Sequence, residues 1–383
     1  MRICFIAPPR FPLPGSGSVE ISIWAAARRL VLRHEVTVLS RRAPGLPEEE
    51  IREGVRLLRL PAAPSFRYAE GIVEAIAAGN FDLIQVDNRP ALLRAVKEAY
   101  PALPAVLYLH SLTFVPAGPL TAARLYPADA VIVNSASLAD RLRRRFPGMG
   151  LAPQVVPLGA DLSRFVPADE ALRDRMRSLY RISSRRYVLL FAGRVIPRKG
   201  LPVLIRAAAR VNRFYPVQLV VAGSGDARYI RRLRSLARRL RLPFLFLGPV
   251  PHGDMHRIYQ AADCFICPSQ RHEAFGLVNV EAMASGLPVI ASAIGGIVEI
   301  LGSGRTGMLV ADYRRPSAFA RAIRTLIRRP DRARAMGEEG RRAAVDRYGW
   351  EATARRLESL YRQTLESRAV PASSPPVSGQ SRC

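Results

Sequence analysis

Short apolar segments alternate with amphipathic stretches along nearly the whole chain, and this alternation constrains the fold more than any other feature. Before residue 150 the apolar segments lie at 3–7, 34–40, 55–60, 81–87, 105–110 and 130–135. Stretches with helical periodicity lie at 18–31, 68–79, 89–99 and 136–146. Apolar strands joined by amphipathic helices are typical of a parallel sheet covered by helices on both faces. The sequence therefore predicts an α/β fold.

The alternation breaks once, at 155–169, a segment with prolines and little periodicity that we interpret as an interdomain linker. Beyond it, apolar segments lie at 187–193, 218–225, 244–248, 264–269, 288–292 and 307–310. Helical stretches lie at 200–213, 227–240, 253–261, 277–285, 316–328 and 331–366. Two Rossmann-like, doubly wound domains that face each other across a cleft are therefore expected. Ligands of such sheets bind at the carboxyl ends of the strands.

The same pattern predicts the domain bounds. We expect an N-terminal domain at 1–165 and a C-terminal domain at 166–348. A helix at 349–368 would pack back towards the N-terminal domain. Residues 369–383, which are rich in Pro and Ser, would form a disordered tail.

Other classes of protein are disfavoured. The chain has no run of about 18 apolar residues, so no membrane-spanning helix is expected. The N-terminal apolar run is too short for a signal peptide, and four cysteines are too few for a disulfide scaffold. Cys264 and Cys267 would face opposite sides of a strand and so would not share a metal ion. We expect buried thiols in a reducing cytoplasm.

The formal net charge is +27, and only Lys97 and Lys199 among the 58 basic residues are lysine. Residues 181–383 hold 35 basic and 14 acidic residues, so most of the excess lies in the second half. Such a charge suits a nucleic acid, an anionic membrane surface or a phosphorylated small molecule, and arginine-rich codon usage also explains it. The densest stretch, 228–241, is interpreted as a core-packed helix with a solvated basic face.

A glycine pair lies between the first strand and the first helix. Gly15 and Gly17 begin a G-x-G-x-x-G pattern, but its last position is Glu20. Arg41 and Arg42 follow the second strand where an NAD enzyme would place an acid, which leaves an NADP site open. The N–H groups of such a loop can bind an anion at the helix N-terminus, and a plain turn is the alternative.

The segment GRVIPRKG (193–200) follows the first strand of the second domain. It lacks the glycine that precedes the lysine of a P-loop. Arg194 and Lys199 nevertheless lie where a ligand would bind. A lysine in a chain that uses arginine at almost every other basic position indicates a need for a compact ammonium at a phosphate. Gly223, after the next strand, permits either a close backbone approach or a tight turn.

Two carboxylates, Glu273 and Glu281, stand eight positions apart, and Glu281 lies about one turn into a predicted helix. Carboxylates accept hydrogen bonds from sugar hydroxyls, and cations neutralise phosphates. Beside Arg194 and Lys199, these carboxylates suit a hydroxylated, phosphorylated ligand. Helix capping and surface charge are the alternative.

Together these motifs resemble those of the family-four retaining glycosyltransferases, which have the GT-B fold. The segment EAFGLVNVEAMASGLPVIAS carries that family's Glu-x7-Glu signature, and FAGRVIPRKG resembles its donor-phosphate segment. VVPLGADLSRF resembles its linker, although Leu158 and Ala160 depart from the usual sequence. The resemblance implies that the N-terminal domain binds the acceptor and that the C-terminal domain binds a nucleotide-sugar donor.

The resemblance also implies roles for single residues. Arg194 and Lys199 would hold the donor diphosphate and stabilise the leaving group. Glu281 would bind the ribose, and Glu273 would bind hydroxyls of the donor sugar. His110 would lie near the reacting carbon of that sugar, although by itself it would be interpreted as a strand-end histidine with satisfied hydrogen bonds. The other expected contacts are Gly15, Gly17, Gly223, Val250 at the base, and the backbone around Phe275, Gly276 and Leu277.

The expected reaction is therefore retaining transfer of a sugar from a nucleotide-diphosphate sugar to a hydroxyl, in cell-envelope, surface-polysaccharide or glycolipid synthesis. The acceptor would be a saccharide or lipid-linked. The sequence contains no Asp-x-Asp, so we expect neither a metal ion nor a cofactor beyond the donor substrate. The protein would be cytoplasmic, with peripheral contact to an anionic membrane left open and no nucleic acid bound.

Three alternatives stay open at this point. A nucleic-acid-binding protein would fit the charge, but the sequence has no helix-turn-helix, zinc-finger or aromatic RNA-binding signature. An NADP-dependent oxidoreductase would fit Arg41 and Arg42. A sugar-nucleotide epimerase of the same fold would lack the Glu-x7-Glu pattern.

Overall fold

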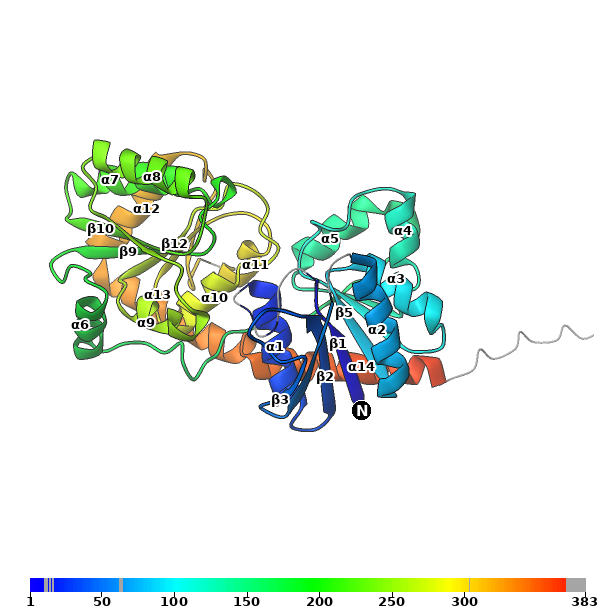
Figure 1. Cartoon of the computed structure of the whole chain (residues 1–383). Coiled ribbons are helices and arrows are strands. Elements are labelled where there is room, and N and C mark those ends of the chain that lie inside the picture. Colours follow the sequence, from blue (N-terminus) through cyan, green and yellow to red (C-terminus); the bar gives the residue numbers. More distant parts are fainter. Residues whose placement is uncertain (10–12, 14, 16, 62–64, 303, 370–383) are drawn as a thin grey trace, which may run out of the picture.

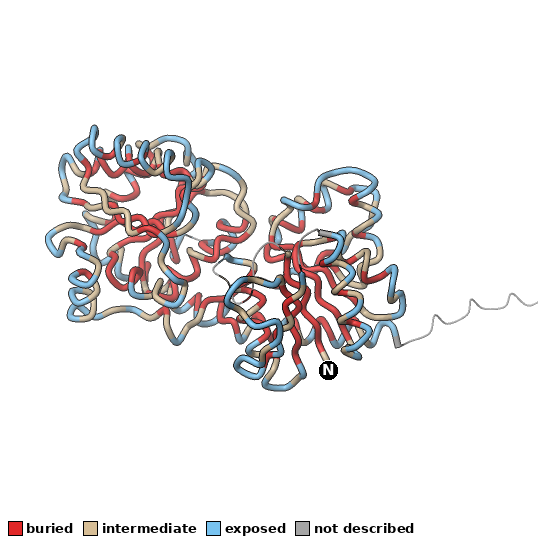
Figure 2. The backbone as a smooth tube through the Cα atoms, viewed as in Figure 1, coloured by how far each residue is buried: buried red, intermediate tan, exposed pale blue. Residues whose placement is uncertain are grey.

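The computed structural model describes residues 1–369 except 10–12, 14, 16, 62–64 and 303. Within these residues the chain forms two α/β domains that are joined at two crossings (Figure 1). Each domain has its own buried sheet (Figure 2). The expected tail lies outside the described residues from residue 370 onward. No helix in the described part of the chain is long and apolar enough to span a membrane.

The N-terminal domain is built on an eight-stranded sheet. Its strands are β1 (Arg2–Ile6), β2 (Glu35–Arg41), β3 (Glu49–Arg52), β4 (Val55–Leu60), β5 (Leu83–Asp87), β6 (Ala105–Leu109), β7 (Ala130–Val133) and β8 (Gln154–Val155). The spatial order is β3-β4-β2-β1-β5-β6-β7-β8, and the strands run parallel apart from the antiparallel edge strand β3. The order reverses between β1 and β5, the kind of switch point at which ligands of doubly wound sheets bind.

Helices cover both faces of this sheet because its strands are apolar on both sides. One face carries α1 (Ser18–Leu30) and the C-terminal helix α14 (Trp350–Ala369). The other carries α2 (Ser65–Gly79), α3 (Pro90–Ala99), α4 (Pro119–Leu125) and α5 (Ala136–Arg145), followed by the short η1 (Pro147–Met149).

The C-terminal domain has a six-stranded parallel sheet in the order β11-β10-β9-β12-β13-β14. Its strands are β9 (Tyr187–Ala192), β10 (Val217–Ala222), β11 (Phe244–Gly248), β12 (Cys264–Cys267), β13 (Val289–Ser292) and β14 (Met308–Val310). Counted within the domain this is 3-2-1-4-5-6, the Rossmann strand order, with the switch point between β9 and β12.

Helices also cover both faces of the second sheet. One face carries α7 (Leu201–Asn212), α8 (Ala227–Arg239) and α12 (Pro316–Arg328). The other carries α9 (Met255–Gln260), α10 (Leu277–Ala284) and α13 (Pro330–Arg347), and the remaining elements are α6 (Glu170–Leu179), α11 (Ile297–Leu301), η2 (Pro197–Lys199) and η3 (His252–Asp254). On α8, Leu233 and Ala237 are buried and the arginines are exposed, which confirms the predicted core-packed helix with a solvated basic face.

The two crossings between the domains lie side by side. The backbone N–H of Ala160 donates to Tyr348 O at 2.7 Å, and Thr353 Oγ1 donates to Pro157 O at 2.9 Å. These contacts fix the point at which α13 ends and α14 begins. The stretch predicted as helical at 331–366 therefore consists of two helices, α13 and α14, because the backbone of Tyr348 and Gly349 pairs with Ala160 of the other crossing.

The C-terminal helix α14 leaves its own domain and packs on the N-terminal domain, against α1 (Figure 1). Arg29 pairs with Glu351 near one end of the helix, and Arg368 pairs with Asp129 near the other. Between them, the hydroxyl of Tyr361 donates to Gln85 on β5. The N-terminal domain is thus completed by α14, the last helix that the structure describes.

The prediction of two Rossmann-like domains is confirmed, and the differences are local. The sequence analysis missed β3, α4, α6 and α11, and its linker at 155–169 includes the last residue of β8. β3 is an exposed edge strand with the sequence EEIR, so it shows no apolar alternation. α6 is strongly polar, and of its residues only Arg177 is buried. Cys264 and Cys267 pack into different clusters on opposite faces of the sheet, as predicted.

Candidate active site

Polar side chains follow the central strands of both sheets, at the ends where parallel strands place their ligands. In the C-terminal domain Lys199 follows β9 and Glu273 follows β12, the two strands that flank the switch point. In the N-terminal domain Asp87 ends β5 and His110 directly follows β6. The predicted residues are thus distributed over both domains.

Lys199 and Glu273 form the centre of the C-terminal site. Lys199 Nζ donates to Glu273 Oε2 at 2.6 Å, and Ser269 Oγ donates to the same oxygen at 3.1 Å. Burial opposes ionisation of the carboxyl, but the adjacent ammonium and these hydrogen bonds outweigh it, so the pKa of Glu273 lies below its ordinary value. The side chains of Lys199 and Glu273 are 14% and 21% exposed, which leaves both within reach of a ligand.

The loops around Lys199 are set by glycine. Gly200 has φ +77°, and a Cβ there would lie 1.9 Å from Pro268 O, so the turn from η2 into α7 needs glycine. Gly223 has φ +149° and packs against Gly193 O, and this packing by itself accounts for the glycine. Arg194 is exposed on the loop directly after β9.

Glu281 lies on α10 and is 3% exposed. Its two oxygens have separate partners: Oε1 lies 2.8 Å from His252 Nε2, and Oε2 accepts from the Tyr259 hydroxyl at 2.9 Å. Burial disfavours a charged His252, but the hydrogen bond and the negative charge of Glu281 outweigh it and raise the pKa of His252. Val250 is partly buried two residues before His252, at the carboxyl end of β11.

The side chains at the N-terminus of α10 are buried. Gly276 caps the helix with φ +102°. Phe275 and Leu277 are buried, and the ring of Phe275 packs edge-on against Tyr348 at 6.0 Å. These side chains belong to the core, so the expected contact of residues 275–277 with a ligand would have to come from their backbone.

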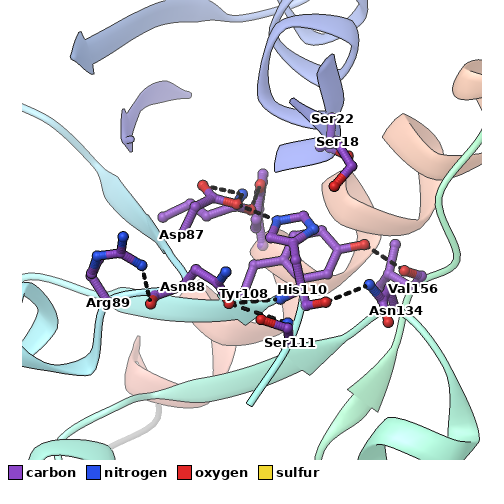
Figure 3. Close-up of polar contacts among 12 residues, drawn as sticks. Ser18, Ser22, Asp87, Asn88, Arg89, Tyr108, His110, Ser111, Asn134 and Val156 are labelled. Carbon is purple, nitrogen blue, oxygen red and sulfur yellow. Dashed lines mark hydrogen bonds and ion pairs between the residues drawn. The ribbon is translucent and has the colours of Figure 1, made fainter. Parts of the chain in front are cut away.

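His110 is 6% exposed and is held on several sides. Its Nε2 lies 2.8 Å from Asp87 Oδ1, and its ring stacks on Tyr108 at 4.3 Å (Figure 3). Its backbone N–H donates to Asn88 Oδ1 at 3.1 Å, and its carbonyl accepts from Asn134 at 3.3 Å. The buried Nδ1 has no hydrogen-bond partner among the described residues.

The first turn of α1 lies close to His110. Gly17 caps this helix, and a Cβ at Gly17 would lie 2.1 Å from Glu20 Oε2. Burial raises the pKa of Glu20, and the charges of His110 and Arg89 act in the opposite direction. Gly15 is partly buried in the described part of the loop. The first turn of α1 thus brings the Glu20 carboxyl near His110.

The loops after the strands of both sheets meet between the domains. Ser135 Oγ donates to Ala274 O at 2.5 Å, beside Glu273 in sequence. The carboxylate of Glu299, on α11, accepts from the backbone N–H groups of Ala136 and Ser137 at 2.8 and 2.7 Å. These N–H groups open α5, so the carboxylate caps a helix of the other domain.

Several residues of the site were missed by the sequence analysis: Glu20, Gln85, Asp87, Ser269, His252, Tyr259, Glu299 and Tyr361. The sequence did contain a signal for Gln85 and Asp87, because two polar residues at alternate positions of an apolar strand share a face. The others had none, because they come from separate segments. No group of three or more His, Cys, Asp or Glu residues that could hold a metal ion occurs among the described residues.

Comparison with known proteins gives the family of this chain. Residues 173–343 match the profile described as glycosyl transferases group 1, and residues 19–164 match that described as glycosyltransferase family 4. YtcC of Bacillus subtilis is 31% identical over 382 residues, which covers 95% of this chain and 93% of YtcC. The chain belongs to the group 1 glycosyltransferases.

Two solved structures have the same fold as this chain. Sucrose-phosphate synthase from Thermosynechococcus elongatus is 25% identical, with a TM-score of 0.81 over 96% of this chain and 100% of that one. Anabaena HepE in complex with UDP-glucose is 20% identical, with a TM-score of 0.79 over 95% of this chain and 100% of HepE. The expected GT-B architecture of two Rossmann-like domains is thereby confirmed.

Proposed function

We propose that this glycosyltransferase moves a sugar from a nucleotide-diphosphate sugar to a hydroxyl group, with retention of configuration. The observation that carries the proposal is the contact of Lys199 with Glu273 at the switch point of the C-terminal sheet. It places a cation for phosphate beside a carboxylate for sugar hydroxyls. The UDP-glucose complex of HepE supports a nucleotide-sugar donor.

The proposed chemistry depends on fixed charge. Cleavage of a glycosyl–phosphate bond builds negative charge on the leaving diphosphate and positive charge on the sugar. Lys199 and Arg194 would stabilise the diphosphate, and because Lys199 is already held by Glu273, little reorganisation is needed during the reaction. Glu273 would bind hydroxyls of the sugar, and His110 would lie at the reacting carbon.

The nucleotide would occupy the C-terminal domain. Glu281, held by His252 and Tyr259, would bind the ribose, and Val250 would contact the base. The backbone at Phe275, Gly276 and Leu277 and the loops at Gly15, Gly17 and Gly223 would approach the phosphates and the sugar. We propose no cofactor and no metal ion, since Lys199 and Arg194 would neutralise the diphosphate.

The acceptor would bind the N-terminal domain and would be a saccharide or a lipid-linked acceptor. Synthesis of cell-envelope polysaccharide or glycolipid, in the cytoplasm or at the inner face of the membrane, is the setting we propose. The exposed arginines of the C-terminal domain would favour an anionic donor and an anionic membrane.

A thermal-shift panel of UDP-, GDP- and ADP-sugars tests the proposal, because a ligand that binds the folded state raises its stability. We expect one nucleotide series to raise the melting temperature and Lys199→Ala to weaken that rise. Turnover of the binding donor should give a product of unchanged anomeric configuration by NMR and should persist in EDTA. An inverted product or a strict need for Mn²⁺ would contradict these two parts of the proposal.

A further inference from the structure

A directional chain of hydrogen bonds joins the C-terminal helix to His110. The hydroxyl of Tyr361, on α14, donates to Gln85 Oε1. The amide nitrogen of Gln85 donates to Asp87 Oδ1 and Oδ2 at 3.2 and 3.0 Å, and Asp87 Oδ1 lies 2.8 Å from His110 Nε2. We call these four residues the Tyr361 relay. All four are buried, and Figure 3 shows the contact between Asp87 and His110.

The sheet fixes this arrangement. Gln85 and Asp87 are two apart on β5, so they lie on the same face. Asp87 pairs in register with Tyr108 on β6, and His110 lies two residues beyond Tyr108, which brings it to the same face. This face carries α14, so Tyr361 reaches Gln85 from the helix that packs over it.

The Tyr361 hydroxyl sets the direction of the chain. Because it donates its proton, Gln85 must turn its carbonyl oxygen to Tyr361 and its NH2 group to Asp87. An NH2 group that faces a carboxyl favours the carboxylate, which can only accept hydrogen bonds. A carboxylate in turn requires that His110 carries its proton on Nε2, and the neutral ring then has a free lone pair on Nδ1.

Without the hydroxyl the opposite arrangement becomes available. If the Gln85 amide turns over, Asp87 loses the two N–H contacts that stabilise its carboxylate. If Asp87 then takes up a proton from solvent on the oxygen that faces His110, it donates that proton to Nε2, and the neutral ring carries its own proton on Nδ1. Burial raises the pKa of Asp87, so the carboxylate depends on the donors around it.

We propose that Tyr361 and Gln85 are positioning residues that keep His110 in its Nε2–H tautomer, so that Nδ1 accepts a hydrogen bond from a substrate hydroxyl. Nδ1 is buried and has no partner among the described residues, although an unsatisfied buried group costs free energy. A substrate hydroxyl would satisfy it. The inference rests on the proposed function, which places His110 beside the sugar.

The helix itself does not depend on the relay. Arg29 pairs with Glu351, and Arg368 pairs with Asp129, so α14 is held on the N-terminal domain on both sides of Tyr361. Tyr361→Phe therefore removes one hydroxyl and leaves the helix in place. Glu20, whose carboxyl interacts with the charges of His110 and Arg89, is unchanged in this variant.

The tautomer can be measured directly, because the chain has only five histidines. Long-range ¹H–¹⁵N NMR of the ligand-free protein distinguishes Nε2–H from Nδ1–H, with His110→Gln to assign the signal. We expect Nε2–H in the wild type and a shift towards Nδ1–H in Tyr361→Phe. Tyr100→Phe is the matched control, since it removes a hydroxyl bound to the Val73 carbonyl in the same domain. An unchanged tautomer in Tyr361→Phe overturns the proposal.

Steady-state kinetics test whether the tautomer of His110 affects turnover. Tyr361→Phe should lower kcat about tenfold, the value of one net hydrogen bond in the transition state, with the KM for the donor unchanged. Gln85→Met should act in the same direction, and the double variant should be no worse than Gln85→Met because both residues act through one chain. Additive losses, or an unchanged kcat, overturn the relay.

The His110→Gln and Tyr361→Phe variants distinguish a failure of the relay from a failure of the proposed function. If His110→Gln keeps full turnover, the proposed role of His110 in transfer is wrong, whatever the tautomer. If His110→Gln is inactive but Tyr361→Phe leaves the tautomer unchanged, the proposed function stands and the relay is wrong. Should Tyr361→Phe fold poorly, Gln85→Met supplies the same NMR readout.

Discussion

The ammonium of Lys199 lies 2.6 Å from the carboxylate of Glu273, although the two residues are 74 positions apart in the chain. Lys199 follows β9 and Glu273 follows β12, and the Rossmann order places these strands side by side. Each residue orients the other, so the cation is already in position when an anion arrives.

Lys199→Ala should lower kcat roughly 10²–10³-fold, the usual effect of removing one fixed donor from a developing negative charge. Steady-state kinetics with a saturating donor would measure this loss. Arg206→Ala is the control, because Arg206 is exposed on the neighbouring helix α7. Equal activity of the two variants would contradict the role of Lys199.

The contact of His252 with Glu281 predicts a pH dependence on the alkaline side. The pKa of His252 is raised in the folded protein, so its stabilising effect is fully present below the ordinary value of about 6.5 and is lost as the pH rises through the raised value. The melting temperature of the wild type should therefore exceed that of His252→Gln most at low pH, and the difference should shrink towards alkaline pH.

His256→Gln is the matched control for this experiment. Burial and the nearby Arg164 and Arg257 lower the pKa of His256, so its effect has the opposite sign and appears on acidification. A difference between wild type and His252→Gln that grows with pH would refute the contribution of the Glu281 contact.

Glu299 should control how tightly the domains close. Its carboxylate caps α5 of the other domain, and such a cap is worth about 1 kcal/mol, or roughly fivefold in an equilibrium. Glu299→Ala should expand the protein in small-angle X-ray scattering and raise the KM for the donor. Glu339→Ala, which removes an exposed ion pair within α13, should do neither.

His272 should make the domain contact sensitive to acid. Burial, together with the charges of Arg141 and Arg144, lowers the pKa of His272 to about 4. Its Nε2 lies 3.0 Å from Ser137 Oγ across the interface. The unfolded chain takes up this proton near 6.5 and the folded protein near 4, so stability falls as the pH drops through that window.

His272→Gln should flatten this acid limb of the melting temperature between pH 6.5 and about 4. His34→Gln serves for comparison, because burial also lowers the pKa of His34, but within the N-terminal domain. If the interdomain distance of the wild type, measured by scattering, stays constant on acidification while that of His272→Gln changes, the assignment to the interface fails.

The sequence by itself determined the fold class and the placement of the main site residues. Apolar strands alternate with amphipathic helices, and this local pattern suffices because each element buries its own apolar face. α12 and β11 fall at the residues that the periodicity predicts, 316–328 and 244–248. Lys199 and Glu273 were singled out because parallel strands end at one edge of a sheet, whereas His110 was named only through the family resemblance.

Only the tertiary structure decided which of these residues are partners. The pairing of His252 with Glu281, the cap that Glu299 places on α5, and the contact of Tyr361 with Gln85 join segments that are distant in sequence. A hydrogen bond depends on a fit of a few tenths of an ångström between donor and acceptor. Periodicity carries no such information, because that fit arises only when both sheets and the C-terminal helix have packed.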